Sequence, residues 1–169
     1  MNFKREEVLE IGRVKGKTLL DIGAGNLAVT AARDFNCEVT TVDVSESALR
    51  QAETEVPEEL RKKIRFEKED AIALTYSDNS FDIVISYGAL HHVDRKKRKD
   101  FIEQAHRVAR EKVIIAEFNP DYFEEVHSKD PYQAVDFFCL EKKLSELGKV
   151  EKYKGKEMSV FILNKNWKI

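Results

Sequence analysis

Cysteine, proline and long apolar runs are all scarce in this chain. Its 169 residues include two cysteines, three prolines and seven glycines. Cys37 and Cys139 are too few and too far apart for a disulfide framework or a Cys-x-x-Cys metal site, so both are expected to be reduced thiols in a cytoplasmic protein. No apolar run approaches the length of a membrane span, and the charged opening MNFKREEVLEI is unlike a signal peptide.

Neither sign of charge prevails. The 29 lysines and arginines nearly balance the 31 aspartates and glutamates, for a formal net charge of -2. Overall charge therefore gives no reason to expect a nucleic-acid partner. A chain of this length suits a single domain, residues 1–169, with a sizeable core. Abundant Lys and Glu with few Gly and Pro point to a thermophilic source.

What is present is an alternation of short apolar runs with longer segments of helical period. Strands are expected at 17–22, 38–44, 63–70, 81–89 and 112–118, and helices at 27–35, 45–56, 95–110 and 130–148, the last starting at Asp130-Pro131. Two more strands, expected at 150–155 and 158–167 and joined by a turn near Gly155, end the chain. This order predicts an α/β fold with a Rossmann-like, doubly wound, mostly parallel sheet and a C-terminal antiparallel hairpin.

In such sheets ligands bind beyond the carboxyl ends of the strands, where this sequence has glycines and acids. The stretch LLDIGAGNLAVT puts Asp21, Gly23 and Gly25 after the first strand, and Asp43 follows the second strand, twenty positions after Gly23. Glycines allow a sharp turn and let a ligand lie against the main chain. A carboxylate at this spacing can accept hydrogen bonds from both hydroxyls of an adenosine ribose.

Asp70-Ala71 follows the third strand, and Ser86-Tyr87-Gly88 follows the fourth. Each feature alone has a simpler interpretation: the glycines as a tight turn, Asp43 as a capping acid, Asp70 as part of a solvated charge run. Their joint order and spacing favour a site for an adenosine-containing cofactor.

The residues alone leave two cofactors open. The spacing Gly23-x-Gly25-x-x-Ala28 also fits the dinucleotide fingerprint, which would make the protein an NAD(P)-dependent oxidoreductase. A pyrophosphate would lie at the N-terminus of the following helix, however, and Asp21 would repel it there. A carboxylate in this place suits an ammonium group, which favours the amino-acid end of S-adenosylmethionine.

Four stretches make the chain resemble class I S-adenosylmethionine-dependent methyltransferases, most of all the branch that methylates quinone precursors and other small molecules. They span roughly residues 15 to 118 and read LLDIGAGNLAVT, VDVSESAL, DAIALTYSDNSFDIVISYGALHHV and KVIIAEF. Leu27 departs from the pattern, because many members have a further glycine there.

The resemblance implies a set of cofactor-binding residues. Asp43 would bind the ribose hydroxyls, Asp70 would approach the adenine amino group, and Ser86 and Tyr87 would border the sulfonium. The full set of candidates is Asp21, Gly23, Gly25, Asp43, Val44, Asp70, Ala71, Ser86 and Tyr87.

The sulfonium already makes its methyl group electrophilic, so the protein mainly has to align the acceptor and exclude water. His91 and His92 follow the fourth strand, and His91 is the candidate general base; the alternative is that both only pack or close the loop. Adjacent histidines rarely point to one ion and no third ligand is evident, so no metal is expected.

The acceptor is expected to be a small molecule, because the chain has no large insertion for a substrate domain. After the fourth strand it also lacks the Asn/Asp-Pro-Pro-aromatic element typical of nucleobase-amine and glutamine-amide methyltransferases. The run RKKRK (95–99) either attracts an anionic acceptor or RNA, or is the solvated start of a helix. Segment 118–132 is either an acceptor lid or a cover for the sheet edge. A non-catalytic cofactor-binding subunit of a partner enzyme remains the other alternative.

Overall fold

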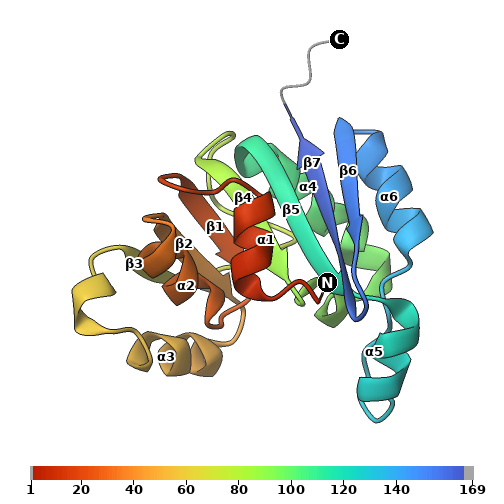
Figure 1. The fold of residues 1–169 in the computed structure, drawn as a ribbon, viewed down its shortest axis with the longest axis horizontal. Helices are drawn as coiled ribbons and strands as arrows, with labels where there is room; N and C mark the ends of the chain where they lie inside the picture. Colours follow the sequence, from red (N-terminus) through yellow and green to blue (C-terminus); the bar gives the residue numbers. More distant parts are fainter. Residues whose placement is uncertain (1, 166–169) are drawn as a thin grey trace.

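The computed structural model describes residues 2–165 and contains one seven-stranded sheet (Figure 1). Its strands are β1 (Thr18–Ile22), β2 (Glu38–Asp43), β3 (Ile64–Lys68), β4 (Phe81–Tyr87), β5 (Ala109–Phe118), β6 (Lys149–Lys154) and β7 (Met158–Asn164). They lie in the order β3-β2-β1-β4-β5-β7-β6. Strands β1 to β5 are parallel, and β7 is antiparallel to both β5 and β6. The predicted fold class, including the terminal hairpin, is confirmed.

Helices cover both faces of this sheet. They are α1 (Arg5–Ile11), α2 (Leu27–Asp34), α3 (Glu46–Thr54), α4 (Arg98–Val108), α5 (Pro120–Val126) and α6 (Phe137–Ser145), with short 3-10 turns η1 (Glu58–Leu60), η2 (Leu90–His92) and η3 (Arg95–Lys97). Figure 1 shows α1 on the near side of the sheet and α4 behind it. Among residues 2–165 no helix is both long and apolar enough to span a bilayer.

Side chains that alternate along the central strands form two separate cores. Leu19 and Ile83 face one core, which α1 and α2 complete, whereas Leu20 and Val84 face the other, against α4 and α6. Because successive side chains of a strand point to opposite faces, a strand that is apolar at every position must be covered on both. The apolar run at 83–85 in β4, buried at each position, therefore already implies the two-sided sheet.

Four helices differ from expectation. The helix expected from Asp130-Pro131 begins at Phe137, because the Asp136 side chain accepts a hydrogen bond from the backbone N–H of Cys139 at 3.0 Å and caps it there. The segment expected to be one helix at 95–110 is the turn η3 followed by α4, and its last two residues belong to β5. Helices α1 and α5 were not expected. The last strand was expected to reach Trp167, but β7 ends at Asn164 and residues 166–169 lie outside the described part of the chain.

Candidate functional site

The carboxylate of Asp43 joins the ends of β1 and β2. Its Oδ2 accepts a hydrogen bond from the backbone N–H of Ala24 at 3.0 Å, and its Oδ1 accepts one from Ser45 at 2.9 Å. The N–H of Gly23 donates to the carbonyl of Val42 at 2.8 Å. The glycine-rich loop is thus held against the end of β2 by main-chain donors, as expected for a loop that presents its backbone to a ligand.

Gly23 and Gly25 of this loop differ in the space around their Cα atoms. Gly23 has a φ of +105°, and a Cβ there would lie 3.0 Å from the Cβ of Ala89, in the loop after β4. A side chain at this position would strain the backbone and push the two loops apart. At Gly25 an added Cβ would meet nothing within 4 Å, so the backbone there faces open space. The ends of β1, β2 and β4 therefore converge.

The end of β3 joins the same edge of the sheet. The backbone N–H of Glu69 donates to the carbonyl of Asp43 at 3.3 Å. Asp70 is exposed, and its carboxylate accepts a hydrogen bond from the backbone of Ile72 at 3.2 Å, with the half-buried Ala71 between them. Val44 is 62% exposed, which is high for a valine, and forms an apolar surface next to Asp43.

Asp21 is buried beneath these loops, only 1% exposed. The hydroxyl of Thr41 donates to its Oδ2 at 3.0 Å. Burial raises the pKa of the Asp21 carboxyl to about 7, although the Thr41 hydrogen bond and the positive charge of Arg5 act in the opposite direction. A cation beside this group would favour its ionised form.

Ser86 and Tyr87 point to opposite sides of β4. The Ser86 hydroxyl is buried and has no hydrogen-bond partner within the described residues. The Tyr87 hydroxyl donates to the backbone carbonyl of Phe3 at 3.0 Å, and the guanidinium carbon of Arg5 lies 5.1 Å from the centre of the Tyr87 ring. Burial raises the pKa of the Tyr87 phenol. The segment before α1 therefore covers this side of the site, a role that nothing in its sequence indicates.

His91 forms a buried pair with Glu117, at the end of β5. The Nδ1 of His91 lies 2.8 Å from Oε1 of Glu117, and the His91 backbone N–H donates to Oε2 at 3.2 Å. Both side chains are 1–2% exposed, and Nε2 of His91 has no hydrogen-bond partner among the described residues. Sequence reasoning missed Glu117, although a lone carboxylate in the otherwise apolar run VIIAEF (113–118) was a usable signal.

Aromatic rings surround this pair. The ring centres of His92, Phe118, Phe123, His127 and Tyr132 lie between 4.1 and 6.1 Å from that of His91. Four of these rings come from segment 118–132, which here includes α5. Burial, together with the neighbouring His91, lowers the pKa of His92. Segment 118–132 thus encloses the histidine that the sequence identified as a candidate base.

The five cations of the run RKKRK (95–99) differ in their burial. Arg98 is 9% exposed and donates to the backbone carbonyls of His91, Val93, Gln133 and Ala134 at 2.6–3.3 Å. The other four cations are exposed. Arg98 also borders a cavity of about 470 Å³. The residues that line this cavity include His91, His92, Arg95, Lys96, Tyr132 and Gln133. No group of three or more metal-binding side chains occurs among residues 2–165.

A parallel sheet in this strand order, with a glycine loop after β1 and an acid after β2, defines a Rossmann-like class that binds an adenosine-containing cofactor. Within that class, residues 19–112, more than half of the chain, match the model of a family described as a methyltransferase domain. The chain belongs to this family as a class I methyltransferase, and S-adenosylmethionine is its cofactor. The dinucleotide interpretation of the glycine loop was therefore wrong.

Among curated relatives, phosphoethanolamine N-methyltransferase 2 of Caenorhabditis elegans is 30% identical over 83% of this chain and 32% of its own length. The 27-O-demethylrifamycin SV methyltransferase of Amycolatopsis mediterranei is 37% identical over 56% of this chain and 35% of its own length. This chain thus spans about a third of either relative. Magnesium protoporphyrin IX methyltransferase of Synechocystis, solved with bound SAH, shares the fold with a TM-score of 0.73 at 17% identity, covering 96% of this chain and 80% of that one.

Proposed function

We propose that this domain transfers the methyl group of S-adenosylmethionine to a small-molecule acceptor. One observation carries the proposal: His91, whose Nε2 has no hydrogen-bond partner within residues 2–165, lies just after β4, at the same end of the sheet as Gly23 and Asp43. The nucleophile of the acceptor attacks the methyl carbon as the carbon–sulfur bond breaks, and the sulfonium becomes a neutral thioether. The two relatives named above carry small-molecule substrates in their names, which supports this class of acceptor.

The cofactor would lie across the ends of β1 to β4. Each carboxylate oxygen of Asp43 uses one lone pair on a backbone N–H and keeps another for a ribose hydroxyl. Val44 offers an apolar surface for the adenine ring, and Asp70 with the Ala71 main chain would meet its polar edge. Asp21 would face the ammonium group through the loop that contains Gly23 and Gly25, and Ser86 and Tyr87 would border the sulfonium.

His91 would act as the general base. With Nδ1 held by the Glu117 carboxylate, the neutral ring keeps its proton on Nδ1 and offers the lone pair of Nε2. Nε2 would take the proton that the acceptor loses as it is methylated, and Glu117 would stabilise the resulting imidazolium. Because His91 is 2% exposed, the acceptor reaches it only when segment 118–132 moves aside, so this segment would serve as a lid.

The burial of His91 under segment 118–132 also supports a second candidate function. A domain that spans about a third of its relatives and encloses its candidate base could hold the cofactor for a partner that completes the acceptor site. In that case the protein binds S-adenosylmethionine but methylates no acceptor alone.

Calorimetric titration with S-adenosylmethionine, S-adenosylhomocysteine and NADH tests the cofactor site directly. We expect both sulfur compounds to bind and NADH not to bind. Incubation with methyl-labelled cofactor and a panel of alcohols, amines, phenols and carboxylates then separates the two functions. Labelled product supports the enzyme, whereas bound cofactor without any product favours the domain that needs a partner.

The role of His91 is tested by His91→Asn and Glu117→Gln. His91→Asn should lower kcat by roughly 10²- to 10⁴-fold, as expected on loss of a general base, while cofactor affinity changes little. Glu117→Gln should lower kcat and displace its pH profile, because Glu117 acts through His91. His106→Asn, on α4, is the matched control. An unchanged kcat and pH profile in His91→Asn would exclude the base.

A further inference from the structure

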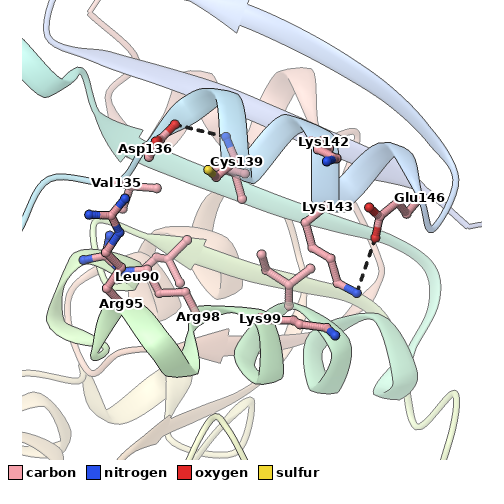
Figure 2. A pocket seen from close by; sticks show the side chains of 12 residues that line it. Leu90, Arg95, Arg98, Lys99, Val135, Asp136, Cys139, Lys142, Lys143 and Glu146 are labelled. Atoms are coloured by element: carbon pink, nitrogen blue, oxygen red, sulfur yellow. Dashed lines mark hydrogen bonds and ion pairs between the residues drawn. The ribbon is translucent and has the colours of Figure 1, made fainter.

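A second cavity lies between α4 and α6, on the face of the sheet opposite α1 (Figure 2). Its volume is about 420 Å³, within the range of small-molecule sites. None of the candidate cofactor residues borders it. The apolar residues that line it are Leu90, Ile102, Val135 and Leu140.

The apolar lining is continuous with the core beneath it. These four side chains are 0–3% exposed and belong to the same buried cluster as the α4 face of the sheet. They form a rigid surface that is already held in place by core packing. A hydrocarbon or aromatic group placed there would lose its contact with water without requiring the protein to rearrange.

Positive charge surrounds this apolar surface. The lining includes Arg95, Arg98, Lys99, Lys142 and Lys143 but only two carboxylates, Asp136 and Glu146. Both carboxylates are engaged: Asp136 caps α6, and Glu146 lies 3.7 Å from Lys143. The lining therefore has a surplus of three positive charges.

Two of these cations are available to a ligand. Arg98 is committed to four backbone carbonyls, Lys143 lies 2.7 Å from Glu103, and Lys99 lies 3.8 Å from the same carboxylate. The side chains of Arg95 and Lys142 make no hydrogen bond or ion pair with the rest of residues 2–165, although the charge of Arg95 helps to lower the pKa of Asp136.

Arg95 and Lys142 lie on either side of Cys139. Figure 2 shows Cys139 between them on the α6 side of the cavity. The hydrogen bond with Asp136 raises the pKa of the Cys139 thiol, and the positive charges of Arg95 and Lys142 act in the opposite direction. The Cys139 thiol therefore lies within the electrostatic influence of both cations.

We propose that this cavity binds a small amphipathic anion, a compound with an apolar body and a carboxylate or phosphate at one end. The apolar body lies on Leu90, Ile102 and Leu140, and the anionic group lies near Cys139 between Arg95 and Lys142. No candidate cofactor-binding residue borders this cavity, although Arg95 and Arg98 also border the cavity beside His91.

Binding of octanoate tests the proposal, with octanol and octylammonium as probes of the same length and different charge, and octyl phosphate as the phosphate form. Calorimetry should show that octanoate or octyl phosphate binds, that octanol binds more weakly and that octylammonium does not bind. Cys139 supplies an independent readout, because Cys37 is buried and Cys139 is exposed. A saturating anion should slow the alkylation of Cys139 by the neutral reagent iodoacetamide.

The double variant Arg95→Gln/Lys142→Gln should weaken octanoate binding roughly tenfold or more, since it removes both charged partners. Lys97→Gln is the matched control, because Lys97 belongs to the same basic run but does not border the cavity. Equal affinity in all variants, equal binding of octanol and octanoate, or unprotected Cys139 would overturn the proposal. Binding to phosphatidylglycerol vesicles without binding of the free anions would also overturn it, in favour of a membrane surface.

Discussion

The two carboxylate oxygens of Asp43 accept backbone hydrogen bonds, and in our proposal the same oxygens also bind the cofactor. Replacing Asp43 with Ala should weaken S-adenosylmethionine binding by ~1–3 kcal/mol, because the ribose hydroxyls lose their acceptor and the glycine loop loses its anchor at Ala24. Calorimetry of the variant measures this change. Glu38→Ala is the control, since Glu38 begins the same strand at the opposite edge of the sheet. Equal loss in both variants would refute a specific role for Asp43.

Asp21 should make stability depend on pH. Its pKa of about 7 in the folded protein exceeds the ordinary value of about 3.9 in the unfolded chain. Between these values the folded state keeps a proton that the unfolded state releases, so the free energy of unfolding falls as pH rises from about 4 to 7. Above about 7 this group adds no further change.

Urea unfolding of the wild type and of Asp21→Asn at pH 5 and pH 8 measures the effect. The wild type should lose on the order of a few kcal/mol more than the variant between these two conditions, since the amide does not titrate. Glu38→Gln, which changes an exposed carboxylate, should behave like the wild type. The same pH dependence in Asp21→Asn and the wild type would show that Asp21 titrates normally.

At the scale of elements, Arg98 ties two segments together. It joins the loop after β4 to the stretch before α6 through four carbonyls, which no other residue type at this position would satisfy equally well. Arg98→Met should therefore lower the free energy of unfolding by roughly 2–4 kcal/mol, because buried carbonyls lose their donors. Urea unfolding checks this, with Lys97→Met as the control. If Arg98→Met lowers the free energy of unfolding no more than Lys97→Met, the contacts of Arg98 with the four carbonyls do not stabilise the fold as proposed.

Strands β1, β2 and β4 could be predicted because each contains a short apolar run that leads to a glycine or an acid. Helix α6 was misplaced because Asp130-Pro131 looks like a helix start, whereas Asp136, six residues later, makes the actual cap. Helices α1 and α5 have seven residues each, too short for a clear helical period. Short helices of this kind depend on packing against neighbours that the sequence does not reveal.

Some residues of the site could be predicted from the sequence and others could not. Gly23 and Asp70 come just after strands and Asp43 ends one, so their meeting at one end of the sheet follows from the parallel strands. The contact of Glu117 with His91 joins β5 to the turn η2, and the contact of Phe3 with Tyr87 joins the start of the chain to β4. Such contacts arise only once the sheet has formed, and no spacing in the sequence encodes them.

For the whole molecule, cofactor binding should raise the stability of the fold. A ligand that binds only the folded state at about 100 times its Kd adds about 2.7 kcal/mol. In a domain of this size each kcal/mol raises Tm by about 2–4 °C. Thermal scans with S-adenosylhomocysteine should therefore show a clear upward shift that NADH does not produce. A Tm that stays constant at saturating S-adenosylhomocysteine would argue against the site at the strand ends.

The hydrogen bond between Tyr87 and Phe3 also determines where an added sequence would emerge. An affinity tag fused upstream would emerge next to the end of β4 and crowd the region proposed for the cofactor. Asn164, in β7 near the other end of the described chain, pairs with Lys112 at the opposite end of the parallel strands, so a purification handle on that side leaves the proposed cofactor region open. A fluorescent dye attached just before Phe3, by contrast, would serve as an optical sensor of cofactor occupancy.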